Sequence, residues 1–365
     1  MKARCPIDWT LFYATVALAI LGATMVYSTS SLLAEQRFGS HLYFIKRQII
    51  WFAISAGMMA VIIRLDLKRL GQYTPLAIIG VIVTLAVVFL MPARNGSHRW
   101  LFLGPFALQP SELAKIILLY YLAHSLSRAD CDIRDYRKSL LPHTPLIGLI
   151  LALIMLEPDL GSVIVLGLTV LTVFYMAGAR VLHMGAAIVP LALGGSFLVF
   201  GLSYKIDRIK SYLASLSDPL QGSYQVKQAI LALGAGGFWG AGLGDGRQKH
   251  FFLPYPHTDF IFAATGEELG FLGLLFALGL YAVILYRGLK IASYQPDRFG
   301  YLLASGVTLC LFFNVAINIG VVTSLIPTTG LPLPLMSYGG SSLLVSLLSI
   351  GILLNLSQRR DGWCQ

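Results

Sequence analysis

The chain carries ten apolar runs, and their lengths limit what it can fold into more than any other feature. A helix needs roughly 20 apolar residues to cross the hydrocarbon core of a bilayer. The fifth and sixth runs are short and separated only by residues 157–160, so a re-entrant hairpin is an alternative there. We predict an all-α integral membrane protein in which residues 1–365 form a single polytopic membrane domain. The ten predicted transmembrane helices lie near residues 9–28, 47–63, 75–91, 111–127, 142–157, 161–177, 183–203, 259–286, 299–323 and 339–356.

Composition supports a chain that is solvated by lipid. Hydrophobic residues make up 56% of the sequence and charged residues 12%, the latter about half the share of soluble proteins. With a mean hydropathy of +0.74, the chain has too little polar surface to cover a water-facing globule. Disordered chains, nucleic-acid-binding modules and secreted disulfide scaffolds are therefore excluded. The net charge of +10 needs no nucleic-acid partner, because basic cytoplasmic loops are expected of a multi-spanning protein.

The distribution of Lys and Arg predicts that both termini are cytoplasmic. With that orientation the inner segments carry 15 basic residues and the outer segments 11. Six of those 11 lie in one large outer loop, residues 204–258, between the seventh and eighth runs. Since cytoplasmic loops are normally the basic ones, this loop is an exception that points to a function. Lys2 and Arg4 precede the first run, which we interpret as an uncleaved anchor.

The four cysteines fit this topology without a disulfide. Cys5, Cys131 and Cys364 fall on the reducing side, and Cys310 falls within the membrane. No pair shares an oxidising compartment, and none has the spacing of metal ligands. We therefore expect neither a disulfide nor a zinc site.

Polar motifs collect in the connections that this topology places outside the membrane. The inner loops are short and basic and carry no comparable motif. Because ionisable groups at membrane depth are expensive and usually functional, we expect the active face to be the outer one. The outer motifs are NGSHRW at 95–100, QPSELAK at 109–115, EPDLG at 157–161, QKHFFLPYPHTDF at 248–260, PTTGLPLP at 327–334 and SYGGSS at 337–342.

Two of these motifs carry charges near the start of a predicted helix. Glu112 and Lys115 are spaced i, i+3, so both point to one helix face. They can form an internal ion pair in which each partner offsets the desolvation of the other. Alternatively, Lys115 faces a phosphate while Glu112 positions it or holds a metal. We expect Ser111 to cap this helix, and Asp159 to be either a turn residue or a functional acid.

The segment 257–259 opens the eighth run. An aspartate at a helix amino terminus is often only a cap, so Asp259 has a purely structural alternative. Glu267 and Glu268 follow eight and nine residues later, which places them roughly 12–14 Å toward the membrane interior. Two adjacent carboxylates there cannot both face lipid. We therefore expect at least one to face a polar cavity or a partner.

The outer loop 204–258 combines basic residues with an apolar, glycine-rich piece. That piece, residues 229–240, is too short to span the membrane, and we interpret it as a re-entrant or surface-lying helix. Basic groups beside such a helix suit an anionic headgroup, and a diphosphate fits better than simple attraction to lipid. The basic residues of the loop are Lys205, Arg208, Lys210, Lys227, Arg247 and Lys249.

Together these motifs resemble the SEDS family (shape, elongation, division and sporulation proteins). The resemblance covers about residues 8–358, and several long motifs in the correct order make a chance match implausible. Residues 25–28 and 247–259 look more like the division-type FtsW branch and its sporulation relatives than the elongation-type RodA branch. The similar segments are 224–225, 248–254, 257–263 and 266–270, with QPSELAK, residues 158–161 and residues 337–342.

The resemblance implies a peptidoglycan glycosyltransferase with ten transmembrane helices that polymerises lipid II on the outer face of the cytoplasmic membrane. The essential aspartate of the family's HTDF motif corresponds to Asp259. Polymerisation joins a sugar hydroxyl to an anomeric carbon and displaces a lipid diphosphate, so it needs a base and positive charge. We predict that Asp259 is the general base and that a single displacement gives inversion. Asn314 and Ser324 depart from the family pattern, in which glutamine and glycine are usual.

The other predicted site residues surround this base. Arg99 is a less favoured candidate for the diphosphate. Glu112 and Asp159 could also hold a Mg²⁺ or Mn²⁺ ion together with substrate phosphate, and no organic cofactor is expected. The predicted substrate-binding residues are Lys115, Arg208, Lys249, His257 and Ser337. The predicted supporting residues are Glu112, Asp159 and Glu268.

The resemblance also implies partners and a location. We expect lipid II and undecaprenyl-diphosphate-linked glycan as ligands, a cognate penicillin-binding transpeptidase and divisome proteins as partners, and no nucleic acid. The protein should lie in the cytoplasmic (inner) membrane at the division site. Three alternatives stay open: a lipid II flippase, an elongation-type polymerase, and an inactive scaffold that recruits a transpeptidase. A flippase should also carry polar groups that reach the inner face.

Overall fold

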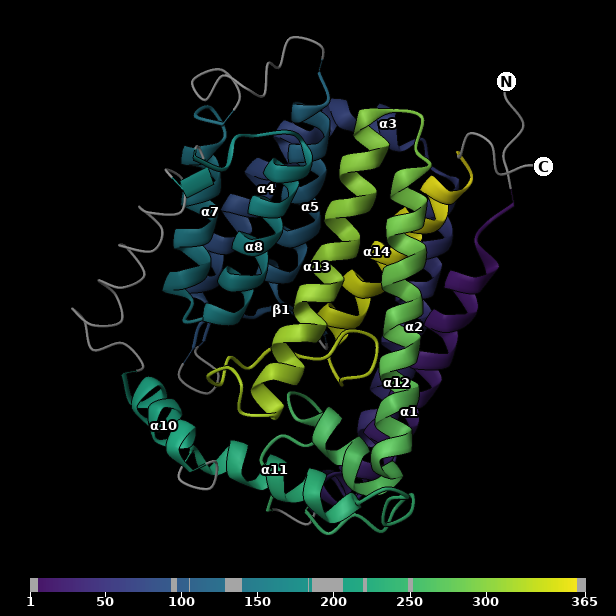
Figure 1. Ribbon diagram of the computed structural model, residues 1–365, viewed down its shortest axis with the longest axis vertical. Helices are drawn as coiled ribbons and strands as arrows, with labels where there is room; N and C mark the ends of the chain where they lie inside the picture. Colours follow the sequence, from purple (N-terminus) through teal and green to yellow (C-terminus); the bar gives the residue numbers. More distant parts are fainter. Residues whose placement is uncertain are drawn as a thin grey trace.

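A computed structural model describes residues 6–92, 97–104, 106–128, 140–182, 184–185, 206–218, 222–248 and 252–359. Most helices run along one bundle, and α10 and α11 lie across one end of it (Figure 1). The elements are α1 (Trp9–Phe38), α2 (Tyr43–Arg64), α3 (Leu67–Leu70), η1 (Gly71–Tyr73), α4 (Thr74–Val87), η2 (Val88–Leu90), β1 (Leu101–Leu103), β2 (Phe106–Leu108), α5 (Pro110–Leu126), α7 (Thr144–Leu156), α8 (Leu160–Met176), α10 (Ile206–Ser217), α11 (Tyr224–Gly236), α12 (Ile261–Ser293), α13 (Arg298–Val322) and α14 (Gly340–Ser357).

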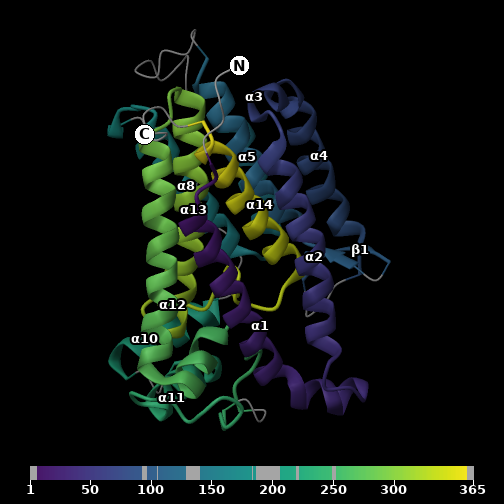
Figure 2. The same cartoon turned by 90° about the vertical axis from the view of Figure 1, so that its right-hand side faces the viewer.

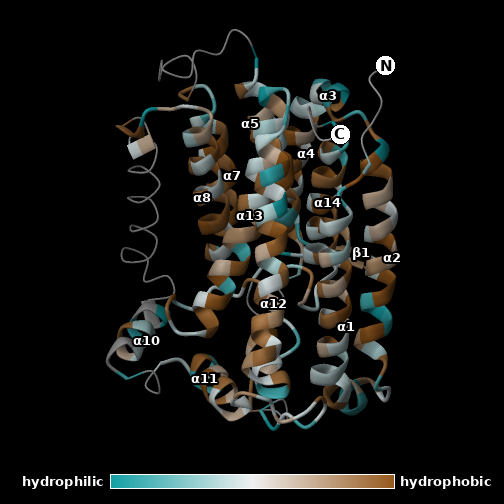
Figure 3. Ribbon diagram, turned by 45° about the vertical axis from the view of Figure 1, so that its right-hand side comes forward, coloured by the Kyte–Doolittle hydropathy of each residue, from teal (hydrophilic) through white to brown (hydrophobic). Residues whose placement is uncertain are grey.

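Within the described residues, six helices are long and apolar enough to cross a membrane: α1, α2, the stretch Leu67–Leu90, α12, α13 and α14. Three more predicted spans coincide with the shorter helices α5, α7 and α8, of 17, 13 and 17 residues. The seventh predicted span, 183–203, lies almost wholly outside the described residues. The multi-spanning helical fold is confirmed, and the count of ten stays a prediction. Figure 3 shows hydrophobic residues along most of these helices.

Two helices form the centre of the bundle. In the most apolar part of α14, 94% of the residues are buried, and in α13 the share is 72%. The corresponding share is 17% in both α2 and α12, which face outward. Figure 2 shows α14 enclosed among α1, α2, α5 and α13. A helix that is apolar on every side can be buried in protein or in lipid, so tertiary packing decides between the two.

The first and last helices meet at one end of the bundle, which we call the terminal end. The Asp8 backbone N–H donates to Ser357 Oγ at 3.1 Å, which joins the start of α1 to the end of α14. Arg287 of α12 forms an ion pair with Asp8 across 2.7 Å. The opposite end, which we call the loop end, carries α10 and α11 (Figure 1). The outer-loop helices therefore lie opposite the chain ends, as the predicted topology requires; which end is cytoplasmic stays a prediction.

One short hairpin departs from the predicted all-α fold. Strands β1 and β2 pair antiparallel, with Leu101 opposite Leu108. The turn contains Gly104 at φ +62°, a backbone conformation that favours glycine. The Gln109 N–H donates to Ser341 Oγ at 2.9 Å, which fastens the hairpin to the start of α14. The motif QPSELAK is thereby held against the last outer connection.

Helix α12 breaks at Gly270, whose φ of 66° and ψ of −167° are not helical. A Cβ at Gly270 would lie 2.3 Å from the backbone nitrogen of Gly240, so only glycine fits this contact. The expectation that Glu267 and Glu268 lie toward the membrane interior is therefore wrong. The stretch before Gly270 is a separate short helix beside α11 at the loop end (Figure 1).

Candidate active site

The predicted base lies in a turn that is fastened to its surroundings. Asp259 precedes α12, whose N-cap is Phe260 without a side-chain capping bond, so Asp259 does not cap this helix. Its backbone carbonyl accepts a hydrogen bond from Asn318 Nδ2 at 2.9 Å. The same amide nitrogen donates to the Leu331 carbonyl at 2.7 Å, which joins the turn to the last outer connection. Sequence reasoning did not single out Asn318, and a polar residue inside an apolar run was the available signal.

The environment of the Asp259 carboxyl favours a base near neutral pH. Burial raises the pKa of Asp259 to about 6, against the opposing effect of the Arg99 guanidinium. The Asp159 carboxylate also raises this pKa, whereas a hydrogen bond from Thr258 and the charge of Arg208 lower it. Four segments that are far apart in sequence therefore meet around this carboxyl. A group of this pKa is mostly ionised at neutral pH and can still accept a proton.

Gly330 forms part of the wall beside this carboxyl. A Cβ at Gly330 would lie 3.6 Å from Asp259 Oδ2, and the backbone there has a φ of +77°. The last outer connection therefore passes directly over the carboxyl at a point where no side chain intervenes.

His257 and Ser337 hold the turn in place. The His257 ring is 7% exposed and lies 4.9 Å from Phe44 and 5.8 Å from Tyr338, measured between centroids. Burial and the charge of Arg37 lower the pKa of His257 to about 4, so the ring is neutral at neutral pH. Ser337 Oγ donates to the Thr258 carbonyl at 2.6 Å and accepts from the Leu333 N–H at 2.8 Å. Both residues position the turn here, and their predicted contact with substrate stays a prediction.

Asp159 links α8 to α5 next to the base. One carboxylate oxygen caps α8 by accepting from the Ser162 N–H at 3.2 Å. The other accepts from Gln109 Nε2 at 2.9 Å and from Ser111 Oγ at 3.3 Å. The expectation that Ser111 caps α5 is wrong, because the N-cap is Gln109 and the serine hydroxyl turns to Asp159 instead. Asp159 thus has both a capping role and a place in the polar cluster.

Glu112 and Lys115 form an enclosed ion pair on α5. Lys115 Nζ lies 2.7 Å from Glu112 Oε1, and the two side chains are 1% and 5% exposed. The ammonium group also lies 3.4 Å from Asn314 Oδ1 on α13. The geometry matches the internal ion pair that the spacing allowed. Direct contact of Lys115 with a phosphate stays a prediction, because the protein encloses this group in the present conformation.

The Arg99 guanidinium is bound by the backbone of residues 157–158, a contact that the sequence analysis did not predict. Arg99 Nε donates to the Glu157 carbonyl at 2.8 Å, and another guanidinium nitrogen donates to the Pro158 carbonyl. The Glu157 side chain is fully buried, and neither of its carboxyl oxygens has a hydrogen-bond partner among the described residues. Burial raises the pKa of Glu157 to about 8, and the Asp159 charge adds to this effect while Arg99 opposes it. Glu157 is therefore mostly protonated at neutral pH.

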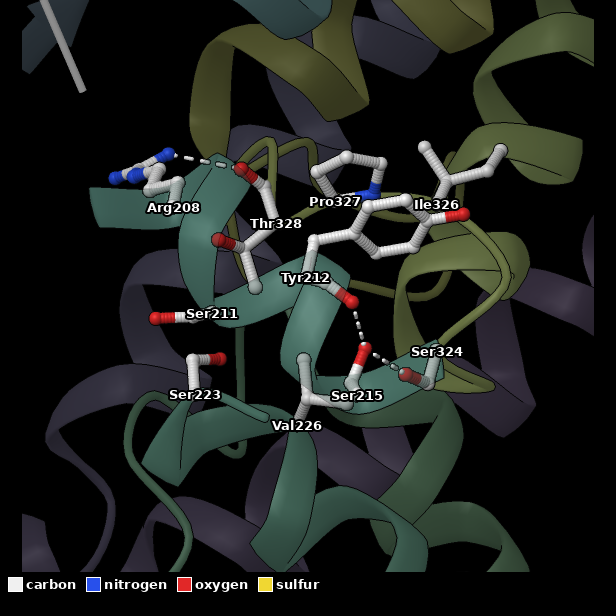
Figure 4. A pocket seen from close by; sticks show the side chains of 10 residues that line it. All are labelled: Arg208, Ser211, Tyr212, Ser215, Ser223, Val226, Ser324, Ile326, Pro327 and Thr328. Atoms are coloured by element: carbon white, nitrogen blue, oxygen red, sulfur yellow. Dashed lines mark hydrogen bonds between the residues drawn. The ribbon is translucent and has the colours of Figure 1, made fainter. Parts of the chain in front are cut away.

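Arg208 approaches the same region from α10. Its Nη1 donates to the Thr328 carbonyl at 2.9 Å, so α10 is joined to the last outer connection (Figure 4). Arg208 is exposed. Lys249 lies outside the described residues, so its position is not described.

Glu267 and Glu268 anchor the outer loop. Glu267 Oε1 accepts from the backbone N–H groups of Arg247 and Gln248 at 2.6 and 3.0 Å. Both carboxylate oxygens of Glu268 accept from Ser28 Oγ, and one accepts from the Gly244 N–H at 3.1 Å. One carboxylate faces loop residues and the other faces the loop and α1. Neither of the two adjacent acids therefore has to face lipid. The supporting role predicted for Glu268 in the site stays a prediction.

Comparison with known proteins identifies the chain. A family model described as "Cell cycle protein", which groups FtsW, RodA and SpoVE, matches residues 8–362. The chain belongs to this family, the SEDS proteins. The family predicted from the motifs is thereby confirmed.

Curated SEDS relatives match over nearly their whole length. The chain is 38% identical over 361 residues to "Probable peptidoglycan glycosyltransferase FtsW" of Geobacter sulfurreducens, covering 97% of this chain and 96% of the relative. It is 40% identical over 356 residues to "Stage V sporulation protein E" of Bacillus subtilis, covering 96% and 97%.

Solved SEDS-like structures share the fold from end to end. One chain, described as "Structural coordination of polymerization and crosslinking by a peptidoglycan synthase complex", superposes with a TM-score of 0.79 at 28% identity, covering 98% of this chain and 99% of that chain. The rod shape determining protein RodA of Thermus thermophilus gives a TM-score of 0.70 at 27% identity, covering 97% and 98%.

The two departures from the SEDS pattern have local explanations in this structure. Asn314 is the amide that faces the Lys115 ammonium group from α13. Ser324, where glycine is usual, has a φ of 62°, in the left-handed region that glycine adopts most easily. Its hydroxyl donates to Ser215 Oγ of α10 at 3.1 Å, which offsets part of the backbone strain.

Proposed function

We propose that this chain polymerises lipid II into glycan strands at the outer face of the cytoplasmic membrane, with Asp259 as the general base. Membership of a family whose curated members are named peptidoglycan glycosyltransferases makes the chain an enzyme of this class. The reaction is a single displacement at an anomeric carbon, so it inverts that centre.

The observation that carries the base assignment is the setting of the Asp259 carboxyl. It is partly exposed, makes no helix cap, and lies among Arg99, Arg208 and Asp159 with a pKa of about 6. In the reaction, the acceptor hydroxyl oxygen bonds to the anomeric carbon while Asp259 takes its proton. The bond from that carbon to the lipid diphosphate breaks, and the diphosphate leaves with the electron pair. Arg99 and Arg208 supply positive charge near the developing anion.

The described residues offer no ready protein site for the predicted divalent cation. Among the described residues, no group of three or more His, Cys, Asp or Glu side chains could hold a metal ion. Asp159 is bonded to Gln109, Ser111 and the start of α8, and Glu112 to Lys115. We therefore derive no step through a metal. A Mg²⁺ or Mn²⁺ ion held mainly by substrate phosphates stays a prediction.

The relatives support a division-type role and a transpeptidase partner. The FtsW names favour a role in division at the division site, while the sporulation relative of 40% identity leaves that role open as well. The solved neighbour belongs to a complex that coordinates polymerisation with crosslinking. This supports a penicillin-binding transpeptidase as partner of the present chain, with undecaprenyl-diphosphate-linked glycan as the growing product.

The flippase alternative is disfavoured by the terminal end of the bundle. A transporter needs a polar path that opens to both sides of the membrane. At the terminal end, charged side chains pair with each other, as in Asp8–Arg287 and Asp66–Arg359 at 2.7 and 3.0 Å. Asn355 of α14 donates to three carbonyls at the end of α2, which fastens these helices together.

Replacement of Asp259 by Asn tests this function. The substitution keeps the size of the side chain and removes its capacity to accept a proton, so polymerisation of labelled lipid II by the protein with its transpeptidase partner should fall about 10²–10⁴-fold. Lipid II binding and thermal stability should persist. Asp245→Asn is the matched control, because it makes the same change at an exposed position of the outer loop.

Near wild-type polymerisation by a correctly inserted Asp259→Asn protein would remove Asp259 from the mechanism. An equal loss in Asp259→Asn and Asp245→Asn would mean that a general charge effect, and not base catalysis, had been measured.

A further inference from the structure

Three neighbouring aromatic residues at the loop end are exposed. Phe238 and Trp239 follow α11 directly, and Phe271 follows the break in α12; they are 54%, 78% and 54% exposed. The Phe238 ring lies 5.3 Å from the Trp239 ring and 6.0 Å from the Phe271 ring, measured between centroids. We call these three residues the aromatic cluster. A contiguous exposed patch of large apolar side chains marks a surface that contacts a membrane or another protein.

Backbone contacts lock the end of α11 to the break in α12. The Phe271 N–H donates to the Gly237 carbonyl at 3.0 Å, and the Ala241 N–H donates to the Glu267 carbonyl at 2.9 Å. Gly240 has a φ of +85°, and a Cβ there would lie 2.3 Å from a backbone carbonyl oxygen of α12. Only glycine fits at this position. These contacts fix the place of the aromatic cluster, so its exposure is part of the fold.

The length of the uncharged part of α12 shows where the membrane boundary lies. Between Glu268 and Arg287 the chain has 18 residues without a charge, and as a helix they extend roughly 27 Å. The hydrocarbon core of a bilayer is about 30 Å thick, so this stretch matches it. Tyr286, which is 61% exposed, lies at the terminal end of the stretch, as expected of an interfacial aromatic belt. Phe271 therefore lies at the boundary on the loop-end side.

The aromatic cluster continues the lipid-facing surface of α12. Beyond Phe271, α12 exposes Leu275 and Phe276 by 53% and 58%, and only 17% of its most apolar part is buried. Figures 1 and 2 show α11 beside the loop-end part of α12. Residues 228–240, which include the rest of the cluster, carry no charge. The surface that lipid covers on α12 thus extends without a charged residue onto the end of α11.

We infer that the aromatic cluster lies in the bilayer at the loop end, between the headgroups and the acyl chains, and anchors the outer loop there. Tryptophan suits this depth, because its ring is apolar while its N–H can bond water or a headgroup. Glu267 and Glu268 bind the backbone of the adjoining residues 244–248. The anchor therefore fixes the depth at which this part of the outer loop lies. It is independent of the reaction that the protein catalyses.

Quenching of Trp239 fluorescence in phosphatidylcholine nanodiscs tests the anchor. The contribution of Trp239 is the difference in emission between the full chain and its Trp239→Phe variant. Phosphatidylcholine that is brominated near the headgroup end of its acyl chains should remove most of this contribution. Lipid that is brominated at the chain ends should remove less, and iodide in the water should have little effect.

Asp245→Trp, made in the Trp239→Phe variant, is the matched control. Asp245 is an exposed acid of the same loop, so a ring at this position should be quenched by iodide and not by brominated lipid. If the Trp239 contribution is quenched in the same way as this control, the cluster faces water and the anchor is refuted. Stronger quenching by bromine at the chain ends would also refute it, because the ring would then lie in the hydrocarbon core.

Amide hydrogen exchange in the same nanodiscs measures whether the rings hold the loop. The double variant Phe238→Ser with Trp239→Ser should raise exchange across residues 224–242 about tenfold or more and leave 271–286 protected. Tyr224→Ser is the matched control and should leave exchange unchanged, because it removes a ring that is 55% exposed from the other end of α11.

Two results of the exchange measurement would refute the anchor. Exchange at the wild-type level in the double variant would mean that the rings do not hold the loop. Loss of protection across residues 271–286 as well would mean that the rings stabilise the protein core and not a contact with lipid.

Discussion

The pKa of Asp259 makes the pH dependence of polymerisation a sharp test of the proposed mechanism. A general base works only when ionised, so the rate should fall as pH drops through the pKa of about 6. At pH 5, about one Asp259 in ten would be ionised, and the rate at saturating lipid II should be about a tenth of its plateau. An aspartate of ordinary pKa would keep about nine tenths of the plateau rate at that pH.

Variants assign this acid limb to one carboxyl. Arg99→Gln removes a positive charge that lowers the pKa of Asp259, so the limb should move to higher pH, and Arg99→Lys should move it less. Glu157, with a pKa of about 8, also titrates near the working range. Below its pKa Glu157 is already neutral, so the permanently neutral Glu157→Gln should leave the acid limb of the rate profile in place. The pKa of His257, about 4, lies below the range.

The assay is the initial rate of glycan formation from labelled lipid II between about pH 5 and pH 8, with protein integrity checked at each pH. A profile that stays flat down to pH 5 would refute the raised pKa. Loss of the limb in Glu157→Gln would transfer the titrating role from Asp259 to Glu157.

Three other predictions concern stability and topology. Lys115→Met leaves the buried Glu112 carboxylate without its partner and should lower the free energy of unfolding by about 3–5 kcal/mol. The additional change Glu112→Gln should recover most of this stability. If it also restores polymerisation, the pair is purely structural. Gly270→Ala places a Cβ 2.3 Å from the Gly240 backbone nitrogen and should lower the thermal unfolding temperature. Gly279→Ala is the control and should not lower it, because nothing lies within 4 Å of a Cβ there. Equal unfolding temperatures of the two variants would contradict the close contact. Leu243 lies at the loop end and is 57% exposed. Leu243→Cys should react with an impermeant thiol reagent in cells whose outer envelope is permeabilised and whose inner membrane is intact. Labelling only after lysis of the inner membrane would reverse the predicted orientation.

The sequence alone determined the class of the protein and the local arrangement of some site residues. A chain with 56% hydrophobic and 12% charged residues cannot cover itself in water, so the membrane fold followed from composition and run length. The pairing of Glu112 with Lys115 followed from i, i+3 spacing, because that distance is set within one helix turn. The motifs also identified the family, since several of them occur in the correct order.

Tertiary structure decided which groups surround the base and which are used elsewhere. The charges of Arg99, Asp159 and Arg208 act on Asp259 because the fold brings together segments that no local pattern connects. Glu267 and Glu268 were misplaced because helix periodicity predicts a continuous α12. The break at Gly270 depends on close packing against Gly240 of the outer loop. Hydropathy likewise could not separate the enclosed α14 from the outward-facing α2, because lipid and protein interior are equally apolar surroundings for a side chain.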